Sequence, residues 1–373
     1  MEKHLHIVAF NVPYPPNYGG VMDVYYRVKA LSEAGVKVHL HCYTYGRKEA
    51  PELDTLCCEV FYYKRDTSKM NLFSRRPYIV ASRDNKELCD RLQKDKHPIL
   101  LEGLHCCSIL EQEELCNGRL VMVRAHNVES DYYTQLAATE SDWLRRQYLS
   151  KEVKKIGRYE GILTKADVVW AITEKDKKQL TSSLDTDVRL LSASHPYSKV
   201  LSRPGKDGYA FYHGNLSVAE NNQAASHLMK LFAGLDGSLV VAGLNPPRWL
   251  EHQAAECPNV RLVPNPDDKE MQRLLANAQV NVLYTTQATG LKLKLLNALF
   301  CGRHCLVNRE MVVGTPFAEL CVVADTDDAM RREINRLLAT PFAADAIEQR
   351  RYLLEPYSNV NVVNPLLDIL STT

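Results

Sequence analysis

The sequence is most informative at first through the patterns that it lacks. It has no Cys-x-x-Cys unit among its 11 cysteines, and no apolar run near the roughly 18 residues of a membrane span. Its net charge is only +1, and neither half is strongly basic. These absences argue against structural zinc held by cysteines, a membrane-spanning protein and nucleic acid as the main partner. We therefore expect a protein of the cytoplasm with reduced thiols and no metal.

One more absence concerns cofactors. The first strand is not followed by Gly-x-Gly-x-x-Gly, so a nicotinamide cofactor on that unit is disfavoured and no cofactor is expected. The N-terminal sequence MEKHLHIVAF is typical of a strand and not of a signal peptide, because its apolar run is short and no cleavage site follows.

Strand and helix patterns alternate along the 373 residues, which favours parallel α/β sheets. The alternation breaks at a polar segment, residues 192–208, that reads as a linker. We expect two Rossmann-like, doubly wound domains, residues 1–195 and 196–350, that face each other across a cleft. The apolar runs predict these strands: Leu5–Phe10, Val36–Tyr43, Cys58–Tyr63, Ile99–Leu101, Leu120–Val123, Val168–Ile172, Val188–Leu191, Tyr209–His213, Ser238–Ala242, Val260–Val263, Val280–Tyr284, His304–Asn308 and Cys321–Ala324.

The segment Thr289–Arg303 combines a helical pattern with charge in an unusual place. Its apolar residues recur at helical spacing, and we expect a helix that Gly290 opens, with Lys292 and Lys294 in its first turn. Cations are disfavoured there unless an anion such as a phosphate offsets them. The alternative is an ordinary amphipathic helix whose lysines are solvated.

Other candidate ligand contacts follow predicted strands. Gly19 and Gly20 come directly before a helix expected over Val21–Glu33, where backbone N–H groups can approach a phosphate, although a plain turn explains them equally. His213, Gly214 and Asn215 end one strand and Gly243 follows another, with turn glycines as the alternative. Asn221 and Asn222 read as a cap for a helix over Asn221–Phe232.

The polar segment Arg124-Ala-His-Asn-Val-Glu129 follows the predicted strand Leu120–Val123. Polar side chains at a strand end lie where α/β enzymes contact ligands, so His126 is the candidate for chemistry. Arg124, Asn127 and Glu129 are further candidates for contact with a ligand. The alternative is that Asn127 caps the next helix, which leaves His126 free.

A basic amphipathic helix is expected over Trp143–Thr164. Such a helix either lies on an anionic membrane surface or is a solvated face of a long helix. Peripheral contact with the inner face of a membrane is therefore one expectation for this protein.

Taken together, these motifs resemble the GT-B glycosyltransferases, specifically the large retaining family 4. Thr289–Arg303 resembles the donor segment of that family, Gly19-Gly20 its N-terminal glycine pair, and Phe211–Asn222 the loop that opens its donor domain. Arg124–Glu129 is similar to the Arg-x-His-Asn-x-Glu of a subset that builds bacterial polysaccharides.

The resemblance implies a transfer of sugar from a nucleoside diphosphate sugar to a glycan or lipid-linked acceptor. Arg124, Asn127 and Glu129 would then lie on the acceptor side, with His126 near the reacting sugar. Gly19, Gly20, Gly290, Lys292 and Lys294 would bind the donor diphosphate without a metal. His213, Gly214, Asn215, Gly243, Thr289 and Asn297 would contact the nucleotide or the sugar. The last segment, 351–373, would pack back on the N-terminal domain as a helix.

The chain departs from the family at two positions. Thr289 and Asn297 stand where the family typically has two glutamates that contact the donor sugar and the ribose. The Asn297 amide can still bond to ribose hydroxyls, whereas Thr289 lacks the carboxylate charge. The missing glutamates leave a non-catalytic subunit descended from a transferase as one alternative. A nucleotide-sugar 2-epimerase, which would share the architecture and the diphosphate site, is the other.

Overall fold

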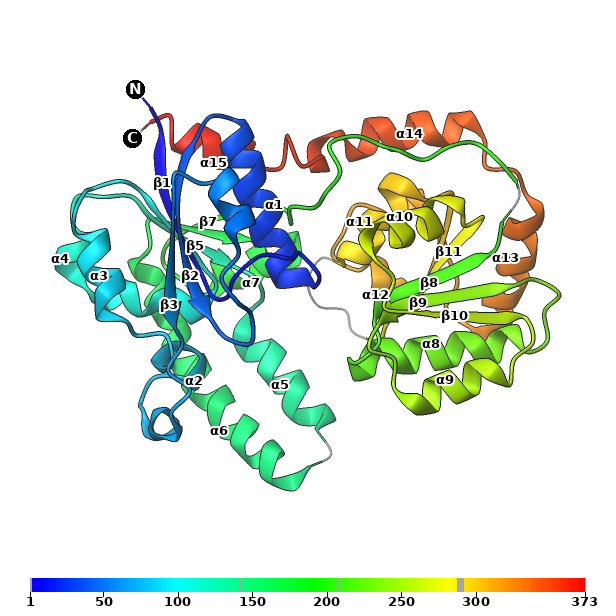
Figure 1. Cartoon of the computed structure of the whole chain (residues 1–373), viewed down its shortest axis with the longest axis horizontal. Coiled ribbons are helices and arrows are strands. Elements are labelled where there is room, and N and C mark those ends of the chain that lie inside the picture. Colours follow the sequence, from blue (N-terminus) through cyan, green and yellow to red (C-terminus); the bar gives the residue numbers. More distant parts are fainter. Residues whose placement is uncertain (1, 141, 207, 287–291, 373) are drawn as a thin grey trace. The chain divides into compact units, whose positions relative to one another are not determined.

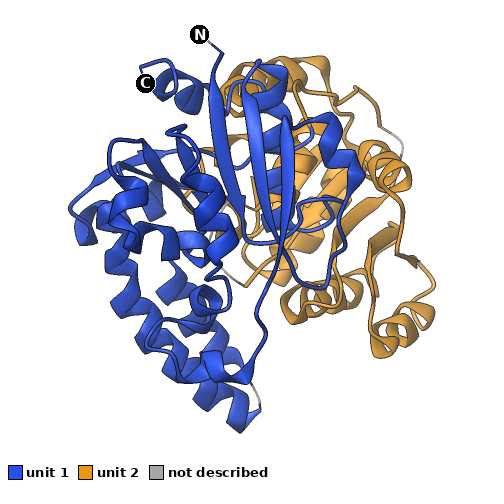
Figure 2. Ribbon diagram, turned by 60° about the vertical axis from the view of Figure 1, so that its left-hand side comes forward, with its two compact units in different colours: residues 1–196, 359–373 blue, residues 197–358 orange. Residues whose placement is uncertain are grey.

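The computed structural model describes residues 2–140, 142–206, 208–286 and 292–372. The chain forms two compact units (Figure 2): residues 1–196 with 359–373, and residues 197–358. Each unit contains one parallel β-sheet with helices, as the alternating pattern predicts. The α/β fold class is therefore confirmed.

The sheet of the first unit has seven strands in the order β3-β2-β1-β4-β5-β6-β7, all parallel. Its strands are β1 (His4–Ala9), β2 (Lys37–Thr44), β3 (Glu59–Lys64), β4 (Ile99–Glu102), β5 (Val121–Ala125), β6 (Val168–Ala171) and β7 (Asp187–Leu190). The strand order reverses between β1 and β4, which makes the carboxyl ends of these two strands the expected place for ligands.

The helices of the first unit include short 3-10 segments, which the sequence pattern did not reveal. They are α1 (Gly19–Glu33), η1 (Pro51–Thr55), η2 (Lys69–Phe73), α2 (Tyr78–Ala81), α3 (Lys86–Leu92), η3 (Leu104–Glu111), α4 (Glu113–Cys116), α5 (Glu129–Thr139), α6 (Trp143–Tyr159), η4 (Glu160–Lys165), α7 (Glu174–Ser183) and α15 (Asn364–Ile369). The helix expected over Trp143–Thr164 thus ends at Tyr159 and continues as a 3-10 turn.

The sheet of the second unit has six parallel strands in the order β10-β9-β8-β11-β12-β13. They are β8 (Ala210–Asn215), β9 (Leu239–Leu244), β10 (Val260–Pro264), β11 (Val280–Leu283), β12 (His304–Val307) and β13 (Val322–Val323). Its helices are α8 (Ala219–Phe232), α9 (Arg248–Ala255), α10 (Asp268–Asn277), α11 (Leu293–Cys301), α12 (Arg309–Val312), η5 (Ala318–Leu320), α13 (Asp327–Ala339), α14 (Ala344–Leu354) and η6 (Glu355–Tyr357). Here the strand order reverses between β8 and β11.

Both faces of each sheet are covered, which explains why the strands read as continuous apolar runs. In β1, Ile7 and Val8 are neighbours in sequence but belong to different hydrophobic clusters, one on each face. Helix α15 contributes Leu366 to the same cluster as Ile7, so the end of the chain packs in the core of the first unit. In Figure 1, α15 lies next to α1.

Candidate functional site

In the first unit, charged side chains gather where β4 and β5 end. Glu102 is the last residue of β4, Arg124 lies in β5, and His126 follows β5. Helix α1 adds Asp23 and Arg27, one turn apart on the same face. We call these five residues the charge network of the first unit.

Hydrogen bonds and ion pairs connect the charge network. Arg27 donates from Nε to Glu102 Oε1 at 3.0 Å and from Nη2 to Asp23 Oδ2 at 2.7 Å. Arg124 Nη2 lies 3.3 Å from the same Asp23 oxygen, and its Nη1 donates to the carbonyl of Leu191. The backbone N–H of Ser194 donates to Asp23 Oδ1 at 2.7 Å. These bonds fix both guanidinium groups in place.

The protonation states follow from these contacts. Burial alone would raise the pKa of Asp23, but Arg27, Arg124 and His126 outweigh it and hold that pKa well below its ordinary value. Burial likewise opposes the ionisation of Glu102, and Arg27 and His126 together lower the pKa of Glu102. Both carboxylates are therefore ionised at neutral pH and balance the two guanidinium groups.

His126 is held in one orientation at the edge of this network. Its Nε2 lies 2.8 Å from Glu102 Oε2, whereas its Nδ1 is 3.6 Å from Asp23 Oδ2. Because an ionised carboxylate only accepts, Nε2 carries the proton of this bond. The side chain is 11% exposed, and the ring meets Phe10 edge to face at 5.4 Å. A fixed, partly accessible imidazole of this kind can contact a ligand.

The sequence motifs did not reveal Glu102, at the end of β4, or Gly103 and His105 in the segment that follows. Gly103 has φ +81°, and a Cβ there would lie 2.9 Å from His105 Nδ1 and 3.5 Å from His126 Cδ2. Burial and Arg83 lower the pKa of His105 well below its ordinary value, so the ring is neutral. Its Nδ1 is buried without a hydrogen-bond partner in the described part of the chain. In the sequence, these residues could have been found as the segment Glu102-Gly-Leu-His105 at the end of a buried strand.

The three candidates for the acceptor side lie in different surroundings. Arg124 is fully buried in the charge network. Asn127 does not cap α5, so that alternative is wrong: the residue before the helix is Val128, and the Asn127 side chain bonds to Glu129 instead. Burial and Glu160 raise the pKa of Glu129 to about 8, so Glu129 is mostly protonated at neutral pH and can donate a hydrogen bond. A role of these residues toward an acceptor stays a prediction.

Helix α1 begins at Gly19, two residues earlier than predicted. No side chain caps its N-terminus, and its first turn contains no acidic residue. A Cβ on Gly20 would lie 2.9 Å from Phe10 Cζ, so this glycine lets α1 pack against the residue after β1. The contact of Gly19 and Gly20 with a diphosphate stays a prediction.

In the second unit, polar side chains gather at the carboxyl end of β8. Lys294 Nζ donates to Asn221 Oδ1 at 3.2 Å and lies 5.3 Å from the centre of the Tyr212 ring. Asn221 donates from Nδ2 to the carbonyl of Asn215 at 3.0 Å. Glu220, in the first turn of α8, accepts a hydrogen bond from Thr285 Oγ1. These residues form the cation cluster of the second unit, together with Lys292.

Burial sets the charge of this cluster. It lowers the pKa of Lys294 to about 8, with Glu220 opposing and Lys292 adding to the effect. The pKa of Lys292 is also lowered by burial, again against Glu220. Among the described residues, Glu220 is the carboxylate that acts on both half-buried ammonium groups. Such an excess of buried positive charge is unfavourable by itself and suits an anionic ligand.

The start of α11 differs from the prediction. The helix begins at Leu293, with Lys292 as its N-cap residue in an extended conformation, so only Lys294 lies in the first turn. Gly290 and Thr289 lie outside the described residues. Asn297 is placed in α11, and its Oδ1 is buried without a hydrogen-bond partner within residues 292–372 or the other described ranges.

The residues at the ends of β8 and β9 have clear packing roles. A Cβ on Gly243 would lie 1.9 Å from the carbonyl oxygen of Gly214, and a Cβ on Gly214 would lie 3.0 Å from Asn221 Cγ. Both glycines therefore let chain segments approach closely. Burial and Lys294 lower the pKa of His213 to about 3, which keeps the ring neutral. A contact of His213, Gly214, Asn215 or Gly243 with a nucleotide stays a prediction.

Asn221 and Asn222 do not cap α8, contrary to the prediction. Helix α8 begins at Ala219 after Val218, and both asparagines lie in its first turn. Asn222 donates to the carbonyl of Leu216 at 3.2 Å, while Asn221 is occupied with Asn215 and Lys294. The two amides thus fix the loop after β8, which carries the cation cluster.

Comparison with known proteins gives relatives of low identity. No protein-family model matches the sequence. The chain is 26% identical over 318 residues to an uncharacterized 44.6 kDa protein in the cps region of Klebsiella pneumoniae, covering 79% of each chain.

Similar solved structures share the fold over nearly the whole chain. Sucrose-phosphate synthase from Thermosynechococcus elongatus has a TM-score of 0.69 at 14% identity, and 99% of each chain is covered. HepE from Anabaena, in complex with UDP and glucose, has a TM-score of 0.66 at 10% identity. The lipopolysaccharide outer core galactosyltransferase WaaB has a TM-score of 0.66 at 13% identity. The comparisons with HepE and WaaB both cover 100% of each chain. The chain therefore has the fold of the GT-B glycosyltransferases, and the resemblance predicted from its motifs is confirmed at the level of the fold.

Proposed function

We propose that this protein is a glycosyltransferase that moves a sugar from a nucleoside diphosphate sugar to a glycan or a lipid-linked acceptor. The observation that carries the proposal is the cation cluster of the second unit, where Lys292 and Lys294 are half-buried and Glu220 is the carboxylate that opposes their charge within the described part of the chain. A diphosphate would supply the missing negative charge. The solved structure of HepE in complex with UDP and glucose supports this class of donor.

The chemistry that we propose needs stabilisation of the leaving group. Negative charge accumulates on the diphosphate as the glycosidic bond breaks, and fixed cations at that position lower the barrier. Lys294 is held in place by Asn221 and the Tyr212 ring, so little reorganisation is needed during the reaction. Two lysines can take the part that a divalent ion plays elsewhere, and we propose that transfer is independent of metal.

The context that we propose is the synthesis of a surface polysaccharide. It is supported by the relative in a cps region and by the likeness to a lipopolysaccharide galactosyltransferase. We propose that the protein acts in the cytoplasm, because nucleotide sugars serve there as the donors for sugar transfer.

A ligand screen tests the proposal. Nucleoside diphosphates and nucleotide sugars are added to the purified chain, and the midpoint of thermal unfolding is measured. A ligand at 100 times its Kd should stabilise the protein by about 2.7 kcal/mol. The preferred donor is then incubated without an acceptor, with and without a chelator. Release of nucleotide by slow hydrolysis supports transfer, and a new nucleotide-sugar isomer indicates an epimerase. No turnover of the donor in this incubation, or in a second one with candidate glycan acceptors added, indicates a binding subunit.

We expect His126→Ala to reduce turnover by about 100-fold, the usual contribution of a side chain that exchanges a proton or hydrogen bond in the transition state. Since His126 lies in the first unit and the cation cluster in the second, the Kd for nucleotide should change little. Steady-state kinetics and nucleotide titration separate the two effects. An unchanged turnover would remove His126 from the site.

Contact with a membrane surface is a further part of the proposal. Among the described helices, none is long and apolar enough to span a membrane. Helices α5 and α6 run side by side and extend from the first unit as a hairpin (Figure 1), and the start of α6 exposes Trp143 and Leu144 at 66% and 69%. Exposed basic residues follow along α6: Arg145, Arg146, Lys151, Lys154 and Arg158. Apolar and basic side chains together suit an anionic lipid surface.

We therefore expect the double variant Trp143→Ser, Leu144→Ser to bind vesicles containing an anionic lipid about tenfold or more weakly than the native chain, because burial of two large apolar side chains is lost. Sedimentation with vesicles measures the bound fraction. Trp249→Ser is the matched control, since Trp249 is 48% exposed but lies in α9 of the second unit. Equal binding of all three proteins, or none by the native chain, would contradict contact through the hairpin.

A further inference from the structure

Five of the 12 histidines gather at the amino-terminal edge of the first sheet, away from the strand ends that carry the charge network. The sequence His-Leu-His occurs in β1 as His4–His6 and in β2 as His39–His41. Leu5 and Leu40 pack in the core cluster on one face of the sheet. Because side chains alternate along a strand, the histidines on either side of each leucine point to the other face. In the parallel register His6 lies beside His39, and His97 comes two residues before β4.

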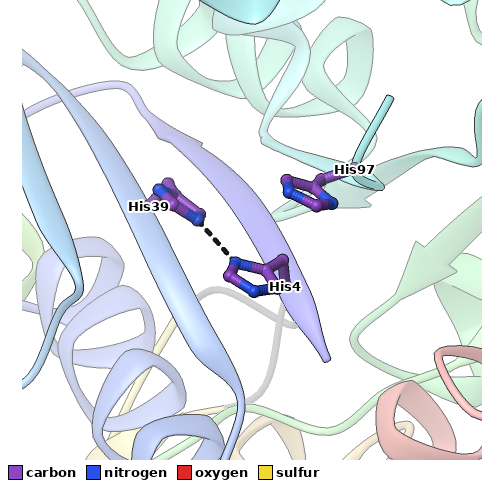
Figure 3. A group of neighbouring side chains, drawn as sticks. All are labelled: His4, His39 and His97. Atoms are coloured by element: carbon purple, nitrogen blue, oxygen red, sulfur yellow. Dashed lines mark hydrogen bonds between the residues drawn. The ribbon is translucent and has the colours of Figure 1, made fainter. Parts of the chain in front are cut away.

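Three of these imidazoles converge (Figure 3). His4, His39 and His97 each offer one ring nitrogen, and the three nitrogens lie within 4.8 Å of one another. His4 Nδ1 is 3.0 Å from His39 Nε2, and the rings of His4 and His97 stack with centroids 4.4 Å apart. The His97 ring has no hydrogen-bond partner among the residues that the structure describes.

A neighbouring carboxylate orients the His39 ring so that its Nε2 can bind a metal ion. Its Nδ1 lies 2.7 Å from Glu59 Oε2. A carboxylate accepts only, so it places the proton of His39 on Nδ1 and leaves the Nε2 lone pair directed at His4 and His97. A carboxylate bonded to the far nitrogen of a histidine is the arrangement that orients imidazole ligands of zinc.

The ring nitrogens of the neighbouring histidines, His6 and His41, already form hydrogen bonds. His6 bonds to His41 at 2.9 Å and to Asp95 at 3.1 Å, and His41 bonds to the Tyr63 hydroxyl at 2.9 Å. These bonds hold β1 and β2 together beneath the three converging rings. At the outer three imidazoles, by contrast, the hydrogen bond between His4 Nδ1 and His39 Nε2 can give way to a metal once the proton of His4 Nδ1 has left or moved to Nε2.

We propose that His4, His39 and His97 form a binding site for a divalent transition metal of the zinc type. Imidazole nitrogens suit Zn²⁺, Ni²⁺ and Cu²⁺, whereas Mg²⁺ and Ca²⁺ take oxygen ligands. Tetrahedral zinc with Zn–N bonds of 2.0–2.1 Å requires nitrogens about 3.3 Å apart. The pair His4–His39 is already near that spacing, and His97 on its loop is the residue that moves inward. A water molecule would complete the coordination.

This site goes beyond the proposed sugar transfer and does not depend on it. It lies at the first residues of β1 and β2, whereas His126 and Glu102 lie at the opposite ends of the strands. The metal would join β1, β2 and the loop before β4, which are distant in sequence. It would therefore stabilise the first unit without taking part in transfer.

The experiment uses the full chain without a polyhistidine tag, stripped with a chelator and then titrated with ZnCl₂. We expect one bound zinc per chain by elemental analysis, a higher midpoint of thermal unfolding, and no shift with MgCl₂. Replacement of zinc by Co²⁺ should produce the visible absorption bands of a tetrahedral nitrogen site. Circular dichroism checks that each variant is folded.

The variants His4→Ala and His97→Ala should lose stoichiometric zinc binding, and Glu59→Gln should weaken it by about 10–100-fold. His252→Ala, an exposed histidine of α9 in the second unit, is the matched control and should bind zinc like the native chain. The proposal would be overturned if the native chain did not bind zinc. It would also be overturned if His4→Ala and His97→Ala bound zinc as well as the native chain does. Loss of nucleotide binding in the ligand screen would leave these zinc results unaffected, so the two proposals fail separately.

Discussion

Replacing Lys294 by methionine is expected to lower kcat/KM for the nucleotide-sugar donor by about 100-fold or more, the usual effect of removing one preorganised donor at developing charge. Lys294 is the half-buried cation that Asn221 and the Tyr212 ring hold in place. Methionine keeps most of the side-chain volume and removes the ammonium group with its charge and its hydrogen bond to Asn221. Titration with the preferred nucleoside diphosphate should show weakened binding as well.

The pH dependence gives a sharper test of the same residue. The pKa of Lys294 is lowered by burial to about 8, from an ordinary value of 10.5, so the ammonium group destabilises the free protein at pH 7 and is neutralised as the pH rises above 8. The binding of a diphosphate to the native chain should therefore weaken by up to about tenfold per pH unit above pH 8. Lys294→Arg should bind with little change from pH 7 to 9, because a guanidinium stays charged.

Two further measurements make this prediction decisive. Lys294→Met without ligand should be at least as stable as the native chain at pH 7, since a buried charge has been removed. Lys269→Met, at an exposed position of α10, is the control and should bind nucleotide normally. Native affinity in Lys294→Met would show that the diphosphate lies elsewhere.

Removing Asp23 is expected to destabilise the first unit by about 3–5 kcal/mol, the usual effect of breaking a buried ion pair. In Asp23→Ala both Arg27 and Arg124 lose a carboxylate partner while they remain fully buried. Urea denaturation measures the free energy of unfolding. Hydrogen exchange of the backbone amides in β4 and β5 shows whether the loss lies in the first unit. Asp236→Ala, at an exposed position, is the control.

The same substitution changes the acid stability. The pKa of Asp23 in the native state lies below its ordinary value of 3.8, so its stabilising contribution is present above that pH and is lost as the pH falls through the native pKa. Asp23→Ala should therefore differ most from the native chain near neutral pH, and the difference should shrink in acid. A loss of less than about 1 kcal/mol at pH 7 would mean that the guanidinium groups find other partners.

The fold was predictable because buried parallel strands are continuous apolar runs separated by helices. Both sheets contain the predicted strands to within a few residues; for example, Val188–Leu191 is observed as Asp187–Leu190. Helix starts were less predictable. Asn221 and Asn127 were read as caps because of their residue type, but Val218 and Val128 precede those helices, and the amides bond elsewhere.

The candidate site was predictable only in part. The motif at Arg124–Glu129 was located at a strand end, since polar residues directly after a buried strand are visible in the sequence. Its partners were not visible, because Arg124 and Asp23 are 101 residues apart and meet only when β5 packs beside α1. The same reason hid Glu220, which faces the two lysines from another helix.

The sequence by itself determined the alternation of strands and helices, the likeness to GT-B glycosyltransferases and the positions of polar residues at strand ends, because these depend on local spacing. Only the tertiary structure decided which charges are buried together. It decided that Glu102 orients His126, that Lys294 is desolvated beside Asn221, and that His4, His39 and His97 converge. The physical reason is that burial and pairing arise between residues distant in the chain, and they control charge and ligand binding.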